Sequence, residues 1–490
     1  MPVDAKNLKS VLVNPADAIE KVENEIAKGR IAGPFRNRPI SNLRCSPIGL
    51  VPKKTSGLRL ITNLSYPQGN SVNDFIDENF TSVSYSSFDT VVSMVQKIGK
   101  GALIGKKDIK SAFRLLPCYP GDFDLLGFKI EGNFYIDKCL PMGYSGSCQI
   151  FEKFSTFLQW LISQDQNSLN LDHYLDDFFF CGRPQTSECE DLMSSFSKMC
   201  SMLGVPVADE KTEGPITSME YLGLLIDTQE MLVKIPHEKL KKLLEEIDII
   251  IFSKKVTLKQ LQSLCGLLSF CTRALPSGRA FSRRLFMAMS KVSKPFHFIR
   301  VTKGMFDDLL VWKYFLENFN GNSYILDADW ISNCDMELFT DSAGGNTKGC
   351  GIYFQGKWCV LNWPKEWENS EILKDITYLE IIPIALAVML WGETFYKKKI
   401  NFQVDNMAVV FILNSKTSKS ERVLKLLRFI VYQTLAKNFH IKCSHISGKV
   451  NIVADALSRG NFQKFRQLAP HADKAPTEVP LQFWELLQTK

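Results

Sequence analysis

The chain has 490 residues, of which 45% are hydrophobic and 11% aromatic, enough for several globular cores. No run reaches about 18 apolar residues, so the sequence predicts no transmembrane helix and no membrane partner. The polar segment 1–10 does not resemble a secretory signal, and the 13 cysteines show no C-x-x-C pair or zinc-finger spacing. These features favour an intracellular protein, in the cytoplasm or nucleus, with reduced thiols and no structural zinc.

The net charge of +7 is unevenly distributed. Between Ile249 and Lys303 there are 11 Lys or Arg and no Asp or Glu. A solubilising helix face would account for the cations, but solubility does not require that acids be excluded. The segment therefore favours a polyanionic partner.

The predicted elements follow from hydrophobic periodicity and from turn residues. Helices are expected over 14–29, 87–98, 149–163 and 189–203, and strands over 47–64 (two strands), 127–136 (a hairpin), 221–226 and 232–235. The pattern is mainly helical after Pro236, and a new strand-rich block begins near Glu337. The tail from Ala469 to Pro480 is predicted to be loosely ordered.

Two adjacent carboxylates in Tyr174-Leu175-Asp176-Asp177 lie between strand-like segments, which predicts a hairpin with both anions at its tip. Asp108 ends another strand-prone stretch upstream. An Asp-Asp pair alone is usually a solvated turn, but aromatic residues surround this one. Three carboxylates at strand ends make an oxygen-only site suited to Mg²⁺ and to two-metal phosphoryl transfer.

The ordered series Asp108, then Leu140-Pro141-Met142-Gly143, then Tyr174 to Asp177 resembles palm motifs A, B and C of the reverse transcriptase family. The resemblance implies that Asp108 and Asp176 bridge the metals and that Asp177 is an auxiliary ligand or orients the site. It also implies roles for six residues in nucleotide binding and for two in a primer-grip hairpin. The nucleotide set is Lys53, Arg59, Phe113, Met142, Gly143 and Lys211, and the primer-grip pair is Leu222 and Gly223.

Within that set, Phe113 takes the place of the residue that excludes a 2′-hydroxyl, and Lys211 that of the acid for pyrophosphate departure. Met142 stands where retroviral enzymes carry Gln. The motif B glycines were expected to let the backbone approach a base pair. A buried core Phe and an exposed basic turn are the structural alternatives for Phe113 and for the Lys53–Arg59 segment.

Four further acids each follow an apolar element, and their order resembles the ribonuclease H family. They are Asp341, Glu380, Asp405 and Asp455. The resemblance implies a second two-metal site. His445, ten residues before Asp455, fits the mobile histidine of that family. A capping or surface role is the alternative for each residue taken singly.

The two resemblances predict a multidomain α+β and α/β protein: a right-hand polymerase followed by a ribonuclease H-like α/β domain. The expected domains are fingers and palm (1–235), helical thumb (236–295), connection or tether (296–333), ribonuclease H (334–460) and tail (461–490). In the thumb, Arg279, Arg283 and Arg284 are candidate nucleic-acid contacts. The implied cofactor is Mg²⁺, two per site, with Mn²⁺ as a substitute. The implied partners are RNA template, DNA primer, RNA–DNA hybrid and dNTPs.

The thumb segment 261–279 and the segment 405–414 resemble those of DIRS-type retrotransposons, with gypsy-type LTR elements as the second choice. A rival from another class is a domesticated RNA-binding scaffold that keeps the fold without chemistry. Loss of carboxylates would mark that case, and all seven are present. A capsid or assembly protein is a third interpretation, which the two acidic constellations disfavour.

Overall fold

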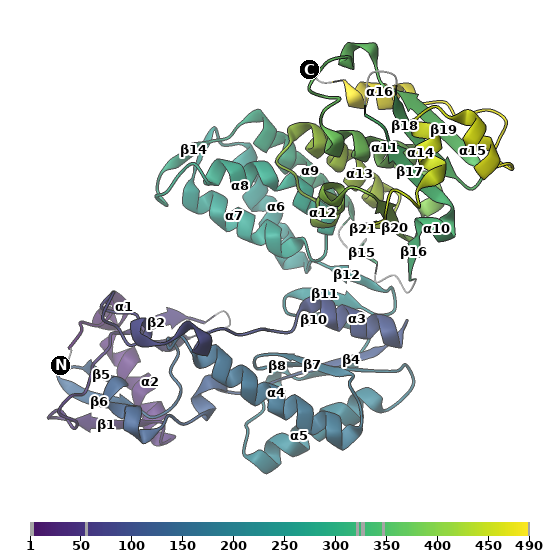
Figure 1. Ribbon diagram of the computed structural model, residues 1–490. Coiled ribbons are helices and arrows are strands. Elements are labelled where there is room, and N and C mark those ends of the chain that lie inside the picture. The colour runs from purple at the N-terminus through teal and green to yellow at the C-terminus, as the bar shows by residue number, and fades with distance from the viewer. Residues whose placement is uncertain (1–3, 54–56, 320–322, 325–328, 345–347, 489–490) are drawn as a thin grey trace. The chain divides into compact units, whose positions relative to one another are not determined.

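The computed structural model describes residues 4–53, 57–319, 323–324, 329–344 and 348–488. The chain divides into two compact units, Met1–Tyr221 and Leu222–Lys490 (Figure 1). Each unit has its own buried core, and each is described by itself below.

The first unit contains five α-helices and ten strands among its described residues. The helices are α1 (Lys9–Val13), α2 (Pro15–Ala27), α3 (Phe88–Ile98), α4 (Ser147–Gln166) and α5 (Glu188–Leu203). The strands are β1 (Ile31–Phe35), β2 (Ile48–Pro52), β3 (Leu58–Thr62), β4 (Leu103–Asp108), β5 (Gly127–Ile130), β6 (Asn133–Asp137), β7 (Leu171–Tyr174), β8 (Asp177–Gly182), β9 (Glu213–Ile216) and β10 (Ser218–Tyr221). The predicted helices and hairpins are all present, with bounds shifted by a few residues.

The central sheet of this unit has the order β7-β8-β4-β9 and is antiparallel. Side chains alternate along a strand, so Phe178 and Phe180 of β8 face one side, where they pack with Phe151 of α4 and Phe196 of α5. Phe179 points to the opposite face and meets the ring of Tyr221 at 5.0 Å. The sheet is therefore buried on both faces, which fixes its register and the position of its strand ends.

The second unit begins with short strands and a helical part. These elements are β11 (Leu224–Asp227), β12 (Leu232–Lys234), α6 (His237–Ile251), β13 (Lys255–Thr257), α7 (Leu258–Cys271), the 3₁₀ turn η6 (Pro276–Phe281), α8 (Arg283–Met289), β14 (Phe298–Arg300), α9 (Lys303–Phe319) and β15 (Ser323–Tyr324). Thr257 and Gln260 form a capping box at the start of α7.

The helical part extends past the boundary expected at residue 295. Helix α9 packs on α6, with Lys313 Nζ 2.7 Å from Asp248 Oδ1, and its Trp312 is fully buried under η6. Residues 298–300 pair with β13. Most of the predicted connection 296–333 thus belongs to the helical part, because its apolar face completes that core. Residues 320–322 and 325–328 of the predicted connection lie outside the described residues.

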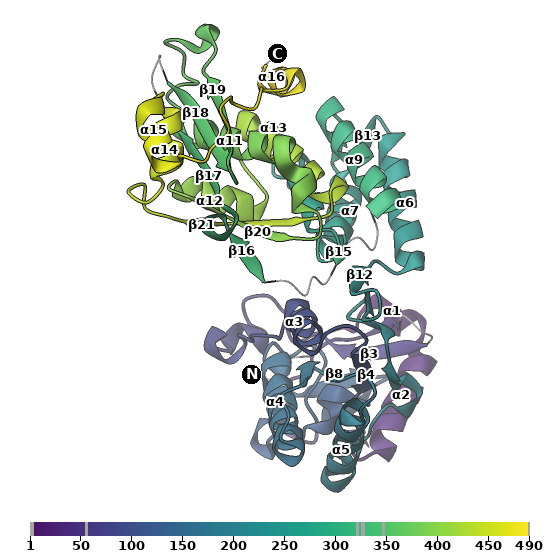
Figure 2. The same ribbon diagram turned by 90° about the vertical axis from the view of Figure 1, so that its right-hand side faces the viewer.

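The remainder of the second unit is an α/β part with two three-stranded sheets (Figure 2). Strands β17 (Leu338–Ser342), β18 (Gly349–Phe354) and β19 (Lys357–Asn362) are antiparallel, whereas β16 (Trp330–Ser332), β20 (Lys399–Val404) and β21 (His440–His445) are parallel in the order β16-β20-β21. The helices are α10 (Asn333–Met336), α11 (Ile376–Trp391), α12 (Met407–Ser415), α13 (Glu421–Ala436), α14 (Ile452–Ser458), α15 (Phe462–Leu468) and α16 (Leu481–Leu487).

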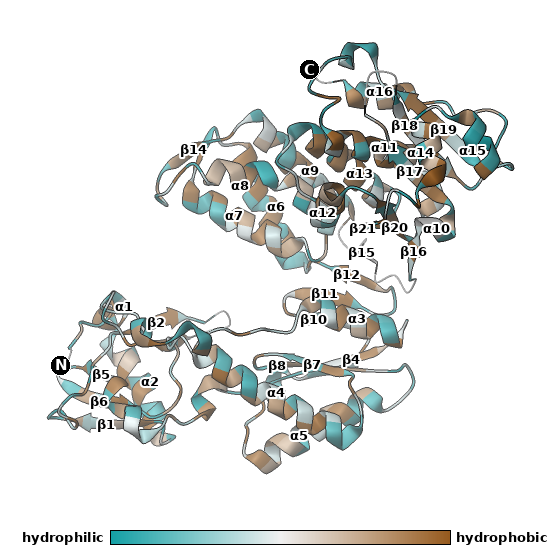
Figure 3. Cartoon of the chain, viewed as in Figure 1, coloured by the Kyte–Doolittle hydropathy of each residue, from teal (hydrophilic) through white to brown (hydrophobic). Residues whose placement is uncertain are grey.

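Helix α11 is apolar on all sides and is the core helix of this part (Figure 3). The segment Ile376–Phe395 is long and apolar enough to cross a membrane, although no run of that length was expected from the sequence. Of its most apolar window, 72% is buried inside the fold. Burial against the sheet and α13 accounts for this composition, because a helix that is hydrophobic all round is a buried helix.

The tail is ordered, which corrects the expectation for Ala469–Pro480. Trp358 Nε1 donates to the Asp473 carbonyl at 2.7 Å, and the Thr477 amide donates to the Trp358 carbonyl at 2.7 Å. Phe465 and Phe483 are fully buried. The polar composition of the segment did not indicate this arrangement, because its backbone is held by Trp358, more than a hundred positions upstream, and by the guanidinium of Arg466.

Candidate active sites

The first candidate site lies at the ends of the two central strands of the first unit. Asp108 ends β4 and Asp177 begins β8, and the two are direct partners in the antiparallel register. Asp176 occupies the turn before β8, where its carbonyl accepts the Ile109 amide at 3.0 Å. The sequence prediction of three carboxylates at adjoining strand ends matches this arrangement.

The three carboxylates of this site are largely buried and lie close to one another, so they repel one another when ionised. Burial, together with the charge of Asp108, raises the pKa of Asp176. Burial followed by the charges of Asp176 and Asp108 raises the pKa of Asp177 to about 7. Crowded carboxylates of this kind are stabilised by a cation. Lys211 supplies one positive charge, with its Nζ 2.9 Å from Asp108 Oδ2.

The first site is supported by buried residues that the sequence did not predict. Tyr221 Oη donates to the Asp177 carbonyl at 3.1 Å, which ties the β8 strand end to β10. His173, Asp172 and Glu152 are buried polar residues behind the turn, and burial lowers the pKa of His173 to about 4. The histidine is therefore neutral at physiological pH. No local motif marks these residues, because their partners are distant in sequence.

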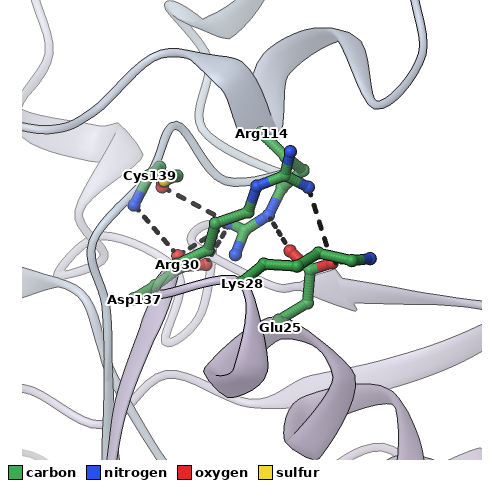
Figure 4. A network of polar contacts seen from close by, with 6 residues as sticks. All are labelled: Glu25, Lys28, Arg30, Arg114, Asp137 and Cys139. Atoms are coloured by element: carbon green, nitrogen blue, oxygen red, sulfur yellow. Dashed lines mark hydrogen bonds and ion pairs between the residues drawn. The ribbon is translucent and has the colours of Figure 1, made fainter. Parts of the chain in front are cut away.

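The turn after Asp108 is fixed by an ion network. Arg114, in the 3₁₀ turn η3 (Ala112–Leu115), places Nη1 2.6 Å from Asp137 Oδ2 of β6 and Nε 3.1 Å from Glu25 Oε2 of α2 (Figure 4). Asp137 also accepts the Cys139 amide at 3.2 Å. These bonds hold Phe113 in place, edge-on to Phe151 at 5.5 Å. Phe113 is partly buried, so it contacts the core and also has an exposed part.

The β2–β3 hairpin carries the two predicted triphosphate contacts. Arg59 is paired with Val51 across the hairpin, and both Arg59 and Lys53 are exposed. The Arg59 charge is near enough to Asp176 to lower the pKa of that carboxyl against the larger effect of burial. The hairpin tip, 54–56, lies outside the described residues.

Gly143 has a structural role within the protein. Its φ is +130°, and a Cβ there would lie 1.8 Å from the Thr62 carbonyl oxygen. The Thr62 amide donates to the Met142 carbonyl at 2.9 Å. Glycine is thus required for close approach to the end of β3, within the protein itself. Leu222 and Gly223 form a turn with φ of +45° and +84°, as a tight hairpin requires.

The second candidate site lies in the α/β part of the second unit. Asp341 is on β17, Glu380 is on α11, and Asp405 follows β20. Each offers a carboxylate oxygen, and these three oxygens lie within 4.8 Å of one another. The structure brings three of the four predicted acids together, whereas Asp455 of α14 pairs with Arg459 and is not one of the three. The charge of Asp455 nevertheless contributes, after burial, to the raised pKa of Asp341.

The donor set fits a hard divalent cation. Asp341 and Glu380 are each 6% exposed. Burial raises the pKa of Asp341 to about 7, and burial with the charges of Asp341 and Asp405 raises the pKa of Glu380 to about 9. None of these three residues carries a positive charge that would neutralise the others. Carboxylate oxygens are the ligands that Mg²⁺ prefers.

Two neighbours of this site orient it. Ser458 Oγ donates to Asp341 Oδ2 at 2.6 Å, a contact that sequence reasoning missed although Ser458 stands three residues after Asp455. His445 ends β21 beside Val404, the residue before Asp405, and is exposed. The histidine therefore lies next to the strand end that leads to Asp405, and it belongs to strand β21 where a loop position was expected.

The metal-free protein is expected to lose stability as pH rises. Asp341 and Glu380 have raised pKa values, so between about pH 4 and 9 the folded state binds more protons than the unfolded state, and the free energy of unfolding falls with pH. Glu380→Gln removes one such group and should raise the melting temperature at pH 8 by at least about 3 °C. Mg²⁺ should stabilise the wild type more at pH 8 than at pH 6. Thermal melts with and without Mg²⁺ test this, and an equal Mg²⁺ effect at both pH values would contradict it.

The three arginines that were predicted to contact nucleic acid differ in their exposure and in their partners. Arg284 Nη1 is 3.4 Å from Asp308 Oδ1, and Arg428 of α13 places Nη2 2.7 Å from Asp308 Oδ2. Asp308 is 2% exposed. Arg284 therefore helps to join the helical part to the α/β part, which leaves less of its guanidinium for a phosphate. Arg283 is partly buried, and Arg279 is exposed.

No protein-family model matches the chain. It is 21% identical over 371 residues to the "Putative enzymatic polyprotein" of Cassava vein mosaic virus, covering 73% of this chain and 52% of that protein. It is 24% identical over 249 residues to the "Pro-Pol polyprotein" of Feline foamy virus, covering 51% of this chain and 19% of that protein. The chain thus spans about half the length of the first relative and less of the second.

Two solved structures have a similar fold. One is the foamy viral protease-reverse transcriptase dRH in complex with double-stranded DNA, with TM-score 0.54, 16% identity and coverage of 91% of this chain and 71% of that one. The other is the foamy viral protease-reverse transcriptase in complex with RNA/DNA hybrid, with TM-score 0.52, 16% identity and coverage of 91% and 55%. The chain has a polymerase-type reverse transcriptase fold of mixed α/β content, and its sequence relatives are viral polyproteins.

Proposed function

We propose that this chain is the reverse transcriptase and ribonuclease H part of a retroelement. It copies RNA and DNA templates into DNA and cuts the RNA of RNA–DNA hybrids. The observation that carries the proposal is the pairing of Asp108 with Asp177 at adjoining strand ends, with Asp176 in the turn between β7 and β8. Three carboxylates converge there on a fold of the polymerase type.

The residues of the first site have distinct tasks. Asp108 and Asp176 would hold the two Mg²⁺ or Mn²⁺ ions, and Asp177 would orient them. When bound, such ions activate the primer 3′-oxygen and neutralise the departing pyrophosphate. The hydrogen bond to Asp108 raises the pKa of Lys211, so this lysine stays protonated beside the carboxylates. Because a raised pKa makes it a weaker acid, it would donate a proton to the leaving group only after its bond to Asp108 is broken. Arg59 and Lys53 would bind the dNTP phosphates from the hairpin.

In the second unit, Asp341, Glu380 and Asp405 would hold metal for hydrolysis of the RNA strand, with Asp455 as a further acid. Ser458 fixes Asp341 in one orientation. His445, exposed at the end of β21, is free to move a proton or to assist product release. Because its loss removes no metal ligand, His445→Ala should slow turnover more than it abolishes cleavage.

Phe113→Ala is expected to raise incorporation of ribonucleotides relative to deoxyribonucleotides by at least about tenfold, because a shorter side chain leaves room for the 2′-oxygen. Phe154→Ala is the matched control, since Phe154 contacts the same Phe151 ring from α4. Single-nucleotide incorporation on one primer gives the ratio. An equal ratio in both variants would assign Phe113 to the core alone.

Primer extension on RNA and DNA templates with Mg²⁺ or Mn²⁺, with a parallel assay of hybrid RNA cleavage, tests the whole proposal. The alternative, a domesticated RNA-binding scaffold, predicts binding without either activity. The finer assignment to a DIRS-type element rests on the thumb-like segment 261–279. It can be tested independently of the two enzymatic activities. A tyrosine recombinase reading frame beside the coding sequence would support it, and an integrase reading frame would favour a gypsy-type element.

A further inference from the structure

The β13–β14 ribbon of the helical part has one buried face and one exposed face. Its register pairs Lys255 with Arg300, Val256 with Ile299 and Thr257 with Phe298. Val256 and Ile299 are 2% and 7% exposed and face the core. Because side chains alternate along a strand, the flanking pairs face outward.

The outward-facing side chains form an unfavourable combination if they contact only water. Lys255 and Arg300 are like charges directly opposite each other, a cross-strand pair that destabilises a ribbon. Phe298 next to them is 59% exposed, and Lys255 Nζ lies 4.6 Å from the centre of its ring. Cations and aromatic faces therefore alternate here without a carboxylate from the surrounding segment 249–303.

The loop before β14 extends this surface. An open hollow of about 560 Å³ is lined by Lys291, Val292, Ser293, Phe296, His297 and Phe298. Phe296 is 67% exposed, and its ring meets that of His297 edge-on at 5.0 Å. The volume is within the roughly 300–1,000 Å³ range of sites that hold small organic groups. It is large enough for an unstacked nucleobase.

We propose that this surface binds unpaired nucleotides of a single-stranded nucleic acid. We call it the ribbon face, defined as Lys255, Lys291, Phe296, Phe298 and Arg300. Phe296 and Phe298 stack on bases, and the three cations contact the phosphates between them. The proposal goes beyond the proposed function, because it needs neither carboxylate site.

Charge and aromatic exposure together favour this occupant over others. A duplex offers phosphates but hides the faces of its bases, so it leaves exposed phenyl rings without partners. A second copy of the chain would bring the same cations against each other. A single strand satisfies both features of the surface, because it offers an anion at every nucleotide and an accessible base face.

Fluorescence anisotropy of the full chain with oligothymidylate, oligouridylate and a blunt DNA duplex tests the proposal. Phe296→Ala with Phe298→Ala should weaken single-strand binding about tenfold or more and leave duplex binding within twofold. The slope of log K against log salt concentration should stay the same, because stacking releases no counterion. Lys255→Gln with Arg300→Gln should lower the single-strand salt slope by about 1.4. Tyr396→Ala is the matched control: Tyr396 is 55% exposed and has Lys397 Nζ 5.4 Å from its ring.

Circular dichroism checks that the variants fold, and light scattering and anionic phosphatidylserine vesicles test the rival partners. Equal loss of single-strand and duplex binding would overturn the proposal in favour of backbone docking. Loss of self-association or of vesicle binding, with single-strand affinity unchanged, would overturn it in favour of a protein or lipid contact. Primer extension is scored separately, so an inactive chain whose single-strand affinity depends on the two phenylalanines still supports the ribbon face.

Discussion

Asp176→Asn is expected to reduce primer extension by roughly 10³-fold or more, because the loss of one bridging carboxylate disables a site whose members act as a unit. Asp108→Asn should have the same effect. Template–primer affinity should stay within a few-fold of wild type, since the substitution also removes a negative charge that faces the nucleic acid. Extension rates under single-turnover conditions and anisotropy with the same template–primer measure the two quantities.

Asp89→Asn provides the matched control for this experiment. Asp89 is an exposed carboxylate in the first turn of α3, so its loss changes the net charge of the same unit by the same amount. Extension by this variant should match wild type. Near-normal extension by Asp176→Asn would refute the assignment of the first site.

Asp341→Asn is expected to reduce cleavage of hybrid RNA by roughly 10³-fold or more and to leave primer extension within about twofold of wild type. Asp341 lies in the second unit, where its carboxylate is within 4.8 Å of those of Glu380 and Asp405 and accepts a hydrogen bond from Ser458, whereas the three acids of the first site belong to the first unit. The substitution should therefore reduce hybrid cleavage without reducing primer extension. A labelled RNA strand in a hybrid reports cleavage, and extension is followed in the same preparation.

Two variants sharpen that result. Asp473→Asn removes an exposed charge of the second unit and should change neither activity. Ser458→Ala keeps every carboxylate but removes the hydrogen bond to Asp341, so it should give an intermediate loss with a higher Mg²⁺ requirement. Normal hybrid cleavage by Asp341→Asn would mean that the second carboxylate group is structural.

Local pattern predicted much of the fold. The apolar run from Phe178 to Phe180 beside an acidic turn predicted a strand, and strand β8 contains all three residues. The strand before Asp341 was equally clear, whereas α11 begins at Ile376 and includes Glu380, nine residues before the helical run expected from Ala385 to Leu390. The same patterns indicated which acids lie at strand ends, and thus Asp108, Asp176, Asp177, Asp341 and Asp405 could be named in advance, whereas Glu380, which lies inside α11, was named from the order of the acids.

The sequence did not reveal the contacts between distant residues. Lys211 reaches Asp108, Ser458 reaches Asp341 and Arg428 reaches Asp308 across 103, 117 and 120 positions. Each joins two elements that are distant in the chain, which no local periodicity records. The same reason explains why the close approach of Gly143 to Thr62 was not predicted, and why the polar tail, expected to be loose, is held by Trp358.

By itself the sequence determined the chemistry available to the protein: two sets of carboxylates in a fixed order, and a long segment without acids. These are properties of residue type and of local alternation, which survive whatever the tertiary arrangement is. Only the tertiary structure decided which carboxylates share one site and which arginines are already paired. It also brought Lys255, Phe298 and Arg300 to a single face, because strand register and helix docking bring together residues that the chain keeps far apart.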